Sequence, residues 1–149
     1  MVTFVGTQKE FSDALKSLIE LDYDAIEAYE EAIHRVDGQT YKEVLKEFTQ
    51  DHKRHVHELS NLLLSKGVEV PKGPSIKQLL TKGKVVIATL ISDKLILTAM
   101  RSNEDDTNTA YERMNSRTDI WPEAQSLILS GLADERKHKS WINEQLQRL

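Results

Sequence analysis

The chain has 149 residues, so we expect a single domain over 1–149 with a core large enough to fold without disulfides or a structural metal. It contains no cysteine, which excludes disulfide frameworks, thiolate zinc sites, iron–sulfur clusters and cysteine nucleophiles. Its 20 Lys and Arg against 24 Asp and Glu give a net charge of −4, which argues against nucleic-acid binding because that class needs a basic surface.

Two long segments in the first half of the chain repeat apolar residues with the period of a helix. We expect the first helix over about 7–37, because Thr7 opens a capping box and Gly38 follows at a C-cap position. The second helix is expected over about 40–66, where Thr40 opens another capping box. The two segments therefore predict long amphipathic helices joined by a tight connection.

Residues 67–93 form a long connection between the two halves, and prolines within 68–74 keep its beginning from being helical. Ser75 opens a third capping box, so we expect a short helical piece after it. A second piece is expected over about 85–91, although the apolar run there also suits a strand. The connection is thus predicted to be a partly helical crossover.

The second half again holds two segments with helical period. Ser92 is the expected N-cap of a helix over about 94–115. The last helix is expected over about 119–149, with Pro122 tolerated in its first turn. A long crossover between helices two and three is what a ferritin-like bundle requires, since the chain must return along the bundle. The predicted fold is all-α, a four-helix bundle of two helical hairpins.

Each predicted helix has polar residues where its apolar stripe faces the bundle axis. The six candidates are Asp22, His52, His55, Glu104, Glu135 and His138. Burying an unpaired carboxylate costs several kcal/mol, so acids and imidazoles gathered at the middle of four helices require a shared explanation. One or two divalent cations would compensate the carboxylates and bind the imidazoles. We therefore predict a metal site.

The same polar pattern occurs in both halves of the chain. An acid precedes a tyrosine in Asp22 and Tyr29, and again 82 residues later in Glu104 and Tyr111. The segment Asp51-His52-x-x-His55 has a counterpart 83 residues later in Asp134-Glu135-x-x-His138. Residues spaced i, i+3 lie on adjacent turns of one helix face, which suits metal ligands. Recurrence in register favours one shared site over independent polar residues.

In the metal interpretation, the Glu135–His138 pair binds an ion with the acid of helix one or helix three, and the His52–His55 pair binds on the pseudo-symmetric side. Four further residues would support the ligands by hydrogen bonds: Asp51, Asp134, Tyr29 and Tyr111. The aspartates would each hold the ligand histidine of the other hairpin, and the tyrosines would hold the carboxylates. In the alternative, Glu135 and His138 pair with each other or with Arg101, and the tyrosines are packing aromatics.

The order of these residues resembles the ferritin-like superfamily, whose di-iron proteins carry Glu, Glu-x-x-His, Glu and Glu-x-x-His on successive helices. The corresponding residues are Asp22, His52-x-x-His55, Glu104 and Glu135-x-x-His138. More closely, the stretch from Gly73-Pro-Ser-Ile76 through Asn103-Glu-Asp-Asp106 to Tyr111 is similar to an uncharacterised bacterial ferritin-like family, a domain of unknown function loosely linked with stress-induced bundle proteins. For an iron-containing site, the resemblance implies reaction with O₂ or peroxide.

Two departures from the superfamily pattern bear on the metal. Asp22 reaches one methylene less than Glu, and His52 stands where a bridging Glu is expected. Three imidazoles shift the preference toward Zn²⁺, Co²⁺ or Fe²⁺, so one or two ions of iron or zinc are expected. Because imidazole does not bridge cations as a carboxylate does, we predict weak or mononuclear binding at a degenerate di-metal site. The competing hypothesis is a non-enzymatic stress or scaffold bundle with a metal-free polar network, and the sequence leaves enzymatic activity open.

No targeting signal is visible, because the start of the chain lacks a basic region followed by an apolar run. The most apolar stretch, Val85–Leu97, is broken by polar residues and is too short for a bilayer. We therefore expect a cytoplasmic protein with no membrane and no nucleic-acid partner. The sequence leaves the oligomeric state open, a homodimer included.

Overall fold

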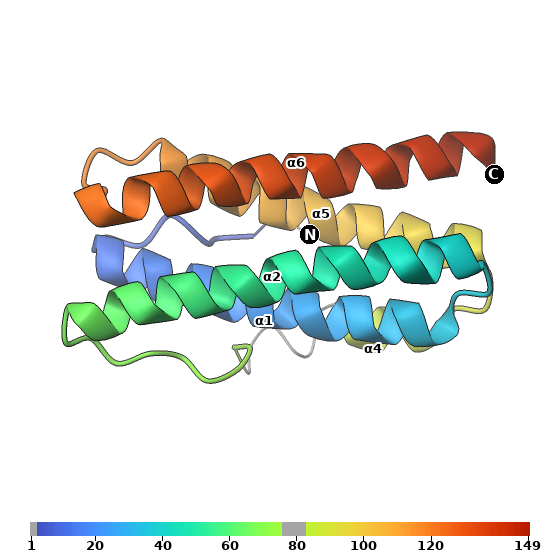
Figure 1. The fold of residues 1–149 in the computed structure, drawn as a ribbon, viewed down its shortest axis with the longest axis horizontal. Coiled ribbons are helices and arrows are strands. Elements are labelled where there is room, and N and C mark those ends of the chain that lie inside the picture. Colours follow the sequence, from blue (N-terminus) through green and yellow to red (C-terminus); the bar gives the residue numbers. More distant parts are fainter. Residues whose placement is uncertain (1–2, 76–82) are drawn as a thin grey trace.

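The computed structural model describes residues 3–75 and 83–149. Within them, four long helices run along the molecule: α1 (Phe11–Arg35), α2 (Gln39–Ser65), α5 (Asp93–Asn115) and α6 (Gln125–Arg148). Helix α1 packs against α2 and α5 packs against α6, so the chain forms two hairpins, which meet where α1 contacts α5 (Figure 1). The fold is all-α, as predicted, and is consistent with a ferritin-like bundle.

The crossover between the hairpins contains a short helix, α4 (Gly83–Ile87), which packs against α1 and α5. The run from Val85 to Ile87 is therefore helical, and the strand alternative is wrong. Ile87 is buried and joins the hydrophobic core, so the helix attaches the end of the crossover to the bundle. The helical piece predicted after Ser75 falls within 76–82, outside the described residues.

Two of the predicted capping boxes are not formed. Helix α1 begins four residues after Thr7, whose hydroxyl donates instead to the carbonyl oxygen of Phe4 at 2.6 Å. Helix α2 begins one residue before Thr40, which therefore lies inside the first turn. A Thr-x-x-Glu pattern stabilises a helix start only where the threonine is the residue immediately before the helix, and neither threonine occupies that position.

In the second hairpin, one of the two helices has the N-cap residue that the sequence predicts. Ser92 caps α5, because its Oγ accepts a hydrogen bond from the backbone N–H of Leu95 at 3.2 Å. Helix α6 starts at Gln125, later than predicted, since the 3₁₀ turn η1 (Pro122–Ala124) precedes it. Pro122 occupies the first turn of η1, where its missing N–H costs no hydrogen bond.

Two hydrophobic clusters fill the bundle, and polar residues separate them along every long helix. The first cluster includes Leu15, Leu59, Met114 and Ile128. The second cluster includes Leu45, Ile96, Met100 and Ile142. The helices are antiparallel within each hairpin, so one cluster fills each end and the polar layer lies at mid-length.

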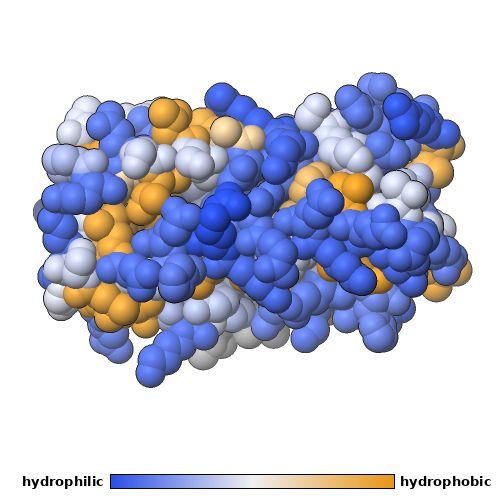
Figure 2. Space-filling model, in the orientation of Figure 1, coloured by the Kyte–Doolittle hydropathy of each residue, from blue (hydrophilic) through white to orange (hydrophobic). Residues whose placement is uncertain are grey.

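The surface follows the same division. The face formed by α2 and α6 is mainly hydrophilic along its middle, and hydrophobic side chains gather toward its two ends (Figure 2). Every helix among the described residues is too short or too polar to span a membrane. The charged middle of this face lies over the polar layer, where the candidate site is found.

Candidate metal centre

All six candidate residues lie in the polar layer, and each is at most 6% exposed. They offer ligand atoms in two groups, and within each group these atoms lie within 4.8 Å of one another. The first group consists of Asp22, His52, His55 and Glu135. The second group consists of His52, Glu104, Glu135 and His138. Since His52 and Glu135 belong to both groups, the structure brings all six residues into one continuous cluster.

Two aspartates orient two histidines, each across the gap between the hairpins. The Nε2 atom of His138 donates to Asp51 Oδ2 at 2.8 Å, and the Nε2 atom of His55 donates to Asp134 Oδ2 at 2.9 Å. The Nδ1 atom of each ring then faces the carboxylates inside the layer. A histidine held in this way through one nitrogen presents the other as a ligand in a fixed direction.

The repeated tyrosines also connect the hairpins. Tyr111 donates to Asp22 Oδ2 at 2.7 Å, and Tyr29 donates to Glu104 Oε1. Burial and the charge of the neighbouring carboxylates raise the pKa of both phenols well above the ordinary value, so both hydroxyls stay protonated. The carboxylates of Asp22 and Glu104 are therefore each held in place by a donor from the opposite hairpin.

His52 lies at the centre of the cluster, and its two nitrogens face different neighbours. Its Nδ1 atom is 2.8 Å from Asp22 Oδ1 and 3.4 Å from Glu135 Oε1. Its Nε2 atom faces Glu104 Oε1 at 3.8 Å, too far for a hydrogen bond. The ring therefore turns one nitrogen toward each group.

Unpartnered polar atoms concentrate in this cluster. Five buried side-chain nitrogen or oxygen atoms among the described residues make no hydrogen bond, and one of them belongs to Ser60. The other four are His52 Nε2, Glu135 Oε1, Glu135 Oε2 and His138 Nδ1. Native proteins leave few such atoms, and each asks for an explanation such as an ion. All four atoms are of the kinds that bind transition metals.

The electrostatics of the layer couple its acids to its bases. Burial alone would raise the pKa of Asp22, but hydrogen bonds with His52 and His55 lower it to about 2. Burial alone would lower the pKa of both outer histidines, but hydrogen bonds with carboxylates raise it to about 9 for His55 and about 10 for His138. Burial raises the pKa of Glu135 to about 7. A bound cation would therefore replace protons in this layer.

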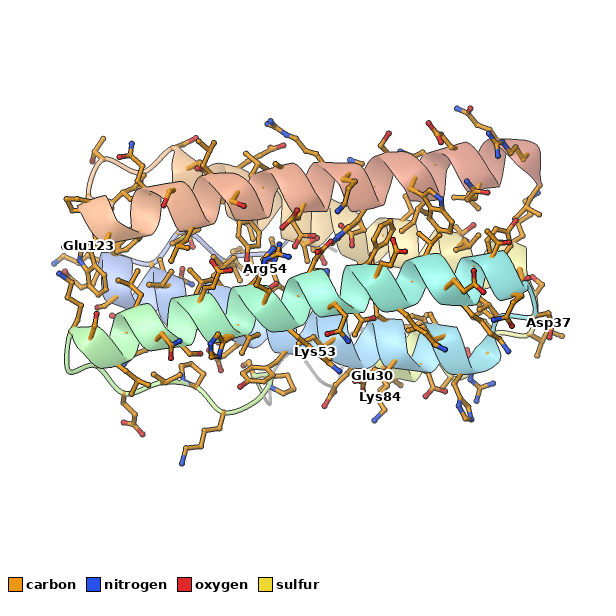
Figure 3. All side chains as sticks on the ribbon, in the orientation of Figure 1. Glu30, Asp37, Lys53, Arg54, Lys84 and Glu123 are labelled. Carbon is orange, nitrogen blue, oxygen red and sulfur yellow. The ribbon has the colours of Figure 1, made fainter. Side chains whose placement is uncertain are left out.

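Two surface cations complete the charge pattern. Arg54 contacts Asp51 at 3.0 Å and also contacts Asp134. Lys137 lies 3.2 Å from Asp51 and 3.9 Å from Asp134. The view of the side chains shows Arg54 between α2 and α6 at mid-length (Figure 3). Sequence analysis missed this pair, although the two residues are also 83 positions apart and belong to the same repeat.

Two further residues of α5 support Glu104 and were not predicted as part of the site. Thr107 Oγ1 donates to Glu104 Oε2 at 3.1 Å. Asn108 Nδ2 donates to the same oxygen at 3.5 Å and to the backbone carbonyl of Glu135 at 3.1 Å. Their polar side chains within an otherwise apolar stripe were the available signal.

Comparison with protein families gives a match over most of the chain. Residues 10–116 match the family described as DUF2383, a domain of unknown function. The chain belongs to this family. The matched segment contains the candidate residues of α1, α2 and α5, whereas Glu135 and His138 on α6 lie beyond it. Neither the curated proteins nor the solved structures that were compared contain a match to the chain.

Proposed function

We propose that this DUF2383 protein binds divalent metal ions in the polar layer of a ferritin-like bundle. The supporting observation is the convergence of four buried, unpartnered ligand atoms from His52, Glu135 and His138. A buried polar atom without a partner costs about 1–3 kcal/mol, and a cation bound among these atoms removes that cost. The proposal of a metal ion is therefore supported by the chemistry of the ligand atoms as well as by the fold.

The donor set narrows the choice of metal. The second group offers two imidazoles and two carboxylates, which together suit Zn²⁺, Fe²⁺ or Co²⁺. Ca²⁺ and Mg²⁺ favour all-oxygen sites and are poorly matched to it. Two carboxylates also balance the charge of one divalent ion. Iron or zinc is the metal that we propose, with one or two ions per chain.

The residues around the cluster would orient the metal ligands and exclude water from them. Asp51 orients His138, Tyr29 orients Glu104, and the hydrophobic clusters on both sides keep bulk water from the layer. Bound iron would supply redox chemistry with O₂ or peroxide, as the ferritin-like resemblance implies. An iron- or oxygen-related role under stress is the physiological setting that we propose.

Metal content tests the proposal directly. The purified protein, reconstituted with Fe²⁺ or Zn²⁺ and passed through a desalting column, is expected to retain at least one ion per chain by elemental mass spectrometry. Glu135→Gln is expected to lose that ion, and the matched control Glu30→Gln, on the exposed face of α1, is expected to keep it. Retention of equal metal by Glu135→Gln would contradict the proposal.

A metal-free scaffold is the second candidate function, and the charges of the buried histidines and carboxylates favour it. The raised pKa values of His55 and His138 let protonated imidazoles balance the buried carboxylates without a cation. A ligand at a hundredfold excess over its Kd stabilises a protein by about 2.7 kcal/mol, so chelation lowers the melting temperature of a metal protein. An unchanged melting temperature after EDTA treatment would favour the scaffold.

A further inference from the structure

The two groups of the cluster differ in how well hydrogen bonds satisfy them. In the first group, Asp22 accepts from His52 Nδ1 at 2.8 Å, from His55 Nδ1 at 3.3 Å and from Tyr111 at 2.7 Å. The outer nitrogen of His55 is also bonded, to Asp134. The Asp22–His55 part of the cluster is thus a closed hydrogen-bond network that needs no ion.

The second group is open by the same criterion. His52 Nε2 and His138 Nδ1 have no hydrogen-bond partner among the described residues. They face Glu104 Oε1 at 3.8 and 3.5 Å, distances that leave room for an ion between the atoms. An ion entering here breaks no hydrogen bond of His52 or His138, whereas an ion in the first group must displace the two histidine donors from Asp22.

Glu135 turns one oxygen toward each group. Its Oε1 atom lies 3.4 Å from His52 Nδ1 and 3.6 Å from His55 Nδ1. Its Oε2 atom lies 3.5 Å from His138 Nδ1. The same residue therefore offers a ligand atom to both positions, as His52 does with its two nitrogens.

We infer that the two positions fill in order, with the second group taking the first ion and the first group taking a second, weaker ion through His52. This inference rests on the proposed function. His52 Nε2 and His138 Nδ1 bind the first ion, and any proton on these two atoms leaves to solvent, while the Nδ1 proton of His52 stays on the hydrogen bond to Asp22. A second ion forms a bond to Nδ1 when that proton leaves to solvent, so that the imidazolate of His52 and the carboxylate of Glu135 link the two ions.

This differs from the expectation drawn from the sequence, which treated His52 as a ligand of one ion only. With one ion bound, His52 is still a ligand of that ion only. Because its two nitrogens face different groups, a second ion then binds to the other nitrogen. The order follows from the unequal hydrogen bonding of the two groups, and an equal pair of carboxylate bridges would not produce it.

Cobalt titration of matched variants tests the order. In the metal-free wild type, Co²⁺ absorption in the visible region is expected to rise in two steps, the second at least about tenfold weaker. The repeat supplies the matched pair His55→Gln and His138→Gln. His55→Gln is expected to keep the first step within about threefold and to lose the second. His138→Gln is expected to weaken the first step by at least about a hundredfold, because loss of a ligand should cost at least as much as the 10–100-fold typical of the partners that orient ligands.

Several outcomes would overturn the order. Two equal steps in the wild type, or loss of the first step in His55→Gln, would show that the groups are equivalent or that the order is reversed. Absence of any cobalt binding by the wild type would overturn the proposed function itself, and the order with it. One cobalt bound tightly, with no second step up to millimolar Co²⁺, would overturn only the linked second position.

A measurement on the wild type covers the case in which His138→Gln does not fold. With Cu²⁺ as the probe, the electron paramagnetic resonance signal is expected to rise to one equivalent and to fall as the second ion couples to the first through His52. In His52→Gln the coupling is expected to weaken sharply, because only the carboxylate of Glu135 then links the two ions. A wild-type signal that doubles with the second equivalent would overturn the bridge.

Discussion

The two hairpins carry the same polar frame but pack it against different neighbours. Phe48 on α2 and Gly131 on α6 occupy equivalent positions of the repeat, 83 residues apart. The ring of Phe48 stacks on His138 with centroids 4.2 Å apart. Gly131 has no side chain, and a Cβ built there would lie 2.3 Å from Tyr111 Cε1. One hairpin thus braces a ligand histidine with an aromatic ring, and the other leaves space for a tyrosine.

This difference teaches that symmetry of the polar residues does not imply symmetry of the site. In the second group His138 is held by both Asp51 and Phe48, so its Nδ1 atom keeps its direction while unpartnered. In the first group Tyr111 reaches Asp22 only because Gly131 admits its ring. Packing therefore contributes to leaving the histidine nitrogens of the second group unpartnered and to closing the Asp22–His55 part of the first.

Titration of the metal-free protein should give the largest effect. Histidines with raised pKa contribute stability that is fully present below the ordinary value of 6.5 and is lost as the pH rises through about 9 for His55 and about 10 for His138. Glu135, with its pKa raised to about 7, acts in the same direction because its ionisation is disfavoured in the fold. We expect the free energy of unfolding to fall by several kcal/mol between about pH 6 and pH 10.

Urea unfolding at a series of pH values measures this loss. Acid has the opposite effect on Asp22, whose lowered pKa of about 2 contributes stability that is lost as the pH falls from 3.8 through 2. Added Zn²⁺ should stabilise the protein more at pH 8 than at pH 6, because the ion competes with fewer protons. A metal-free protein of constant stability from pH 6 to pH 10 would contradict the coupled network.

Removing the aromatic brace should have the next largest effect. Phe48 is 4% exposed and also packs against Tyr29 and Trp141. Phe48→Ala is expected to cost about 3–5 kcal/mol in urea unfolding, because it leaves a cavity beside the layer. Because Phe48 also holds His138 in place, the variant should weaken metal binding as well. A purely structural role would leave metal affinity unchanged. Phe48→Leu serves as the control for volume, and a loss below 1 kcal/mol for Phe48→Ala would contradict this role.

Filling the space at Gly131 tests the other half of the comparison. A methyl group there must push the Tyr111 ring away from Asp22, and overpacking of this kind costs about 1–3 kcal/mol. This outweighs the gain in helix propensity of about 1 kcal/mol from Gly to Ala. Gly73→Ala is the control, since no heavy atom lies within 4 Å of its built Cβ. Gly131→Ala more stable than wild type would show that the ring has room to shift.

The sequence predicted the architecture well because the four long helices have strong apolar periodicity. The same periodicity placed the six polar residues on inward faces, and the structure brings them together at mid-length. The capping boxes at Thr7 and Thr40 were wrong, because a capping box also depends on where the chain enters the helix. A local sequence pattern does not contain that information.

The inequality of the two groups was beyond reach of the sequence. It depends on the distance and the direction at which the nitrogens of His52 and His138 face a carboxylate, which change with shifts of tenths of an ångström. The roles of Phe48 and Gly131 depend likewise on contacts between helices that are distant in sequence. Periodicity assigns a residue to a face but does not assign its partner.

The smallest effect is expected at the surface cations over the layer. Arg54 is about half exposed and holds Asp51 and Asp134, the residues that orient the ligand histidines. Exposed ion pairs contribute about 0–1 kcal/mol and weaken in salt, so Arg54→Ala should cost less than about 1 kcal/mol in urea unfolding, and less again in 1 M NaCl.

A second exposed ion pair, between α2 and α1, supplies the comparison. Lys53 lies 3.5 Å from Glu30, and both side chains are on the surface away from the layer (Figure 3). Lys53→Ala should match Arg54→Ala in stability but leave metal affinity unchanged, whereas Arg54→Ala should weaken it by less than about tenfold, because it acts on the ligands only through the aspartates. Equal metal affinity of the two variants would show that Asp51 and Asp134 hold the histidines without help from Arg54. The difference between the two groups would then originate entirely in the buried residues.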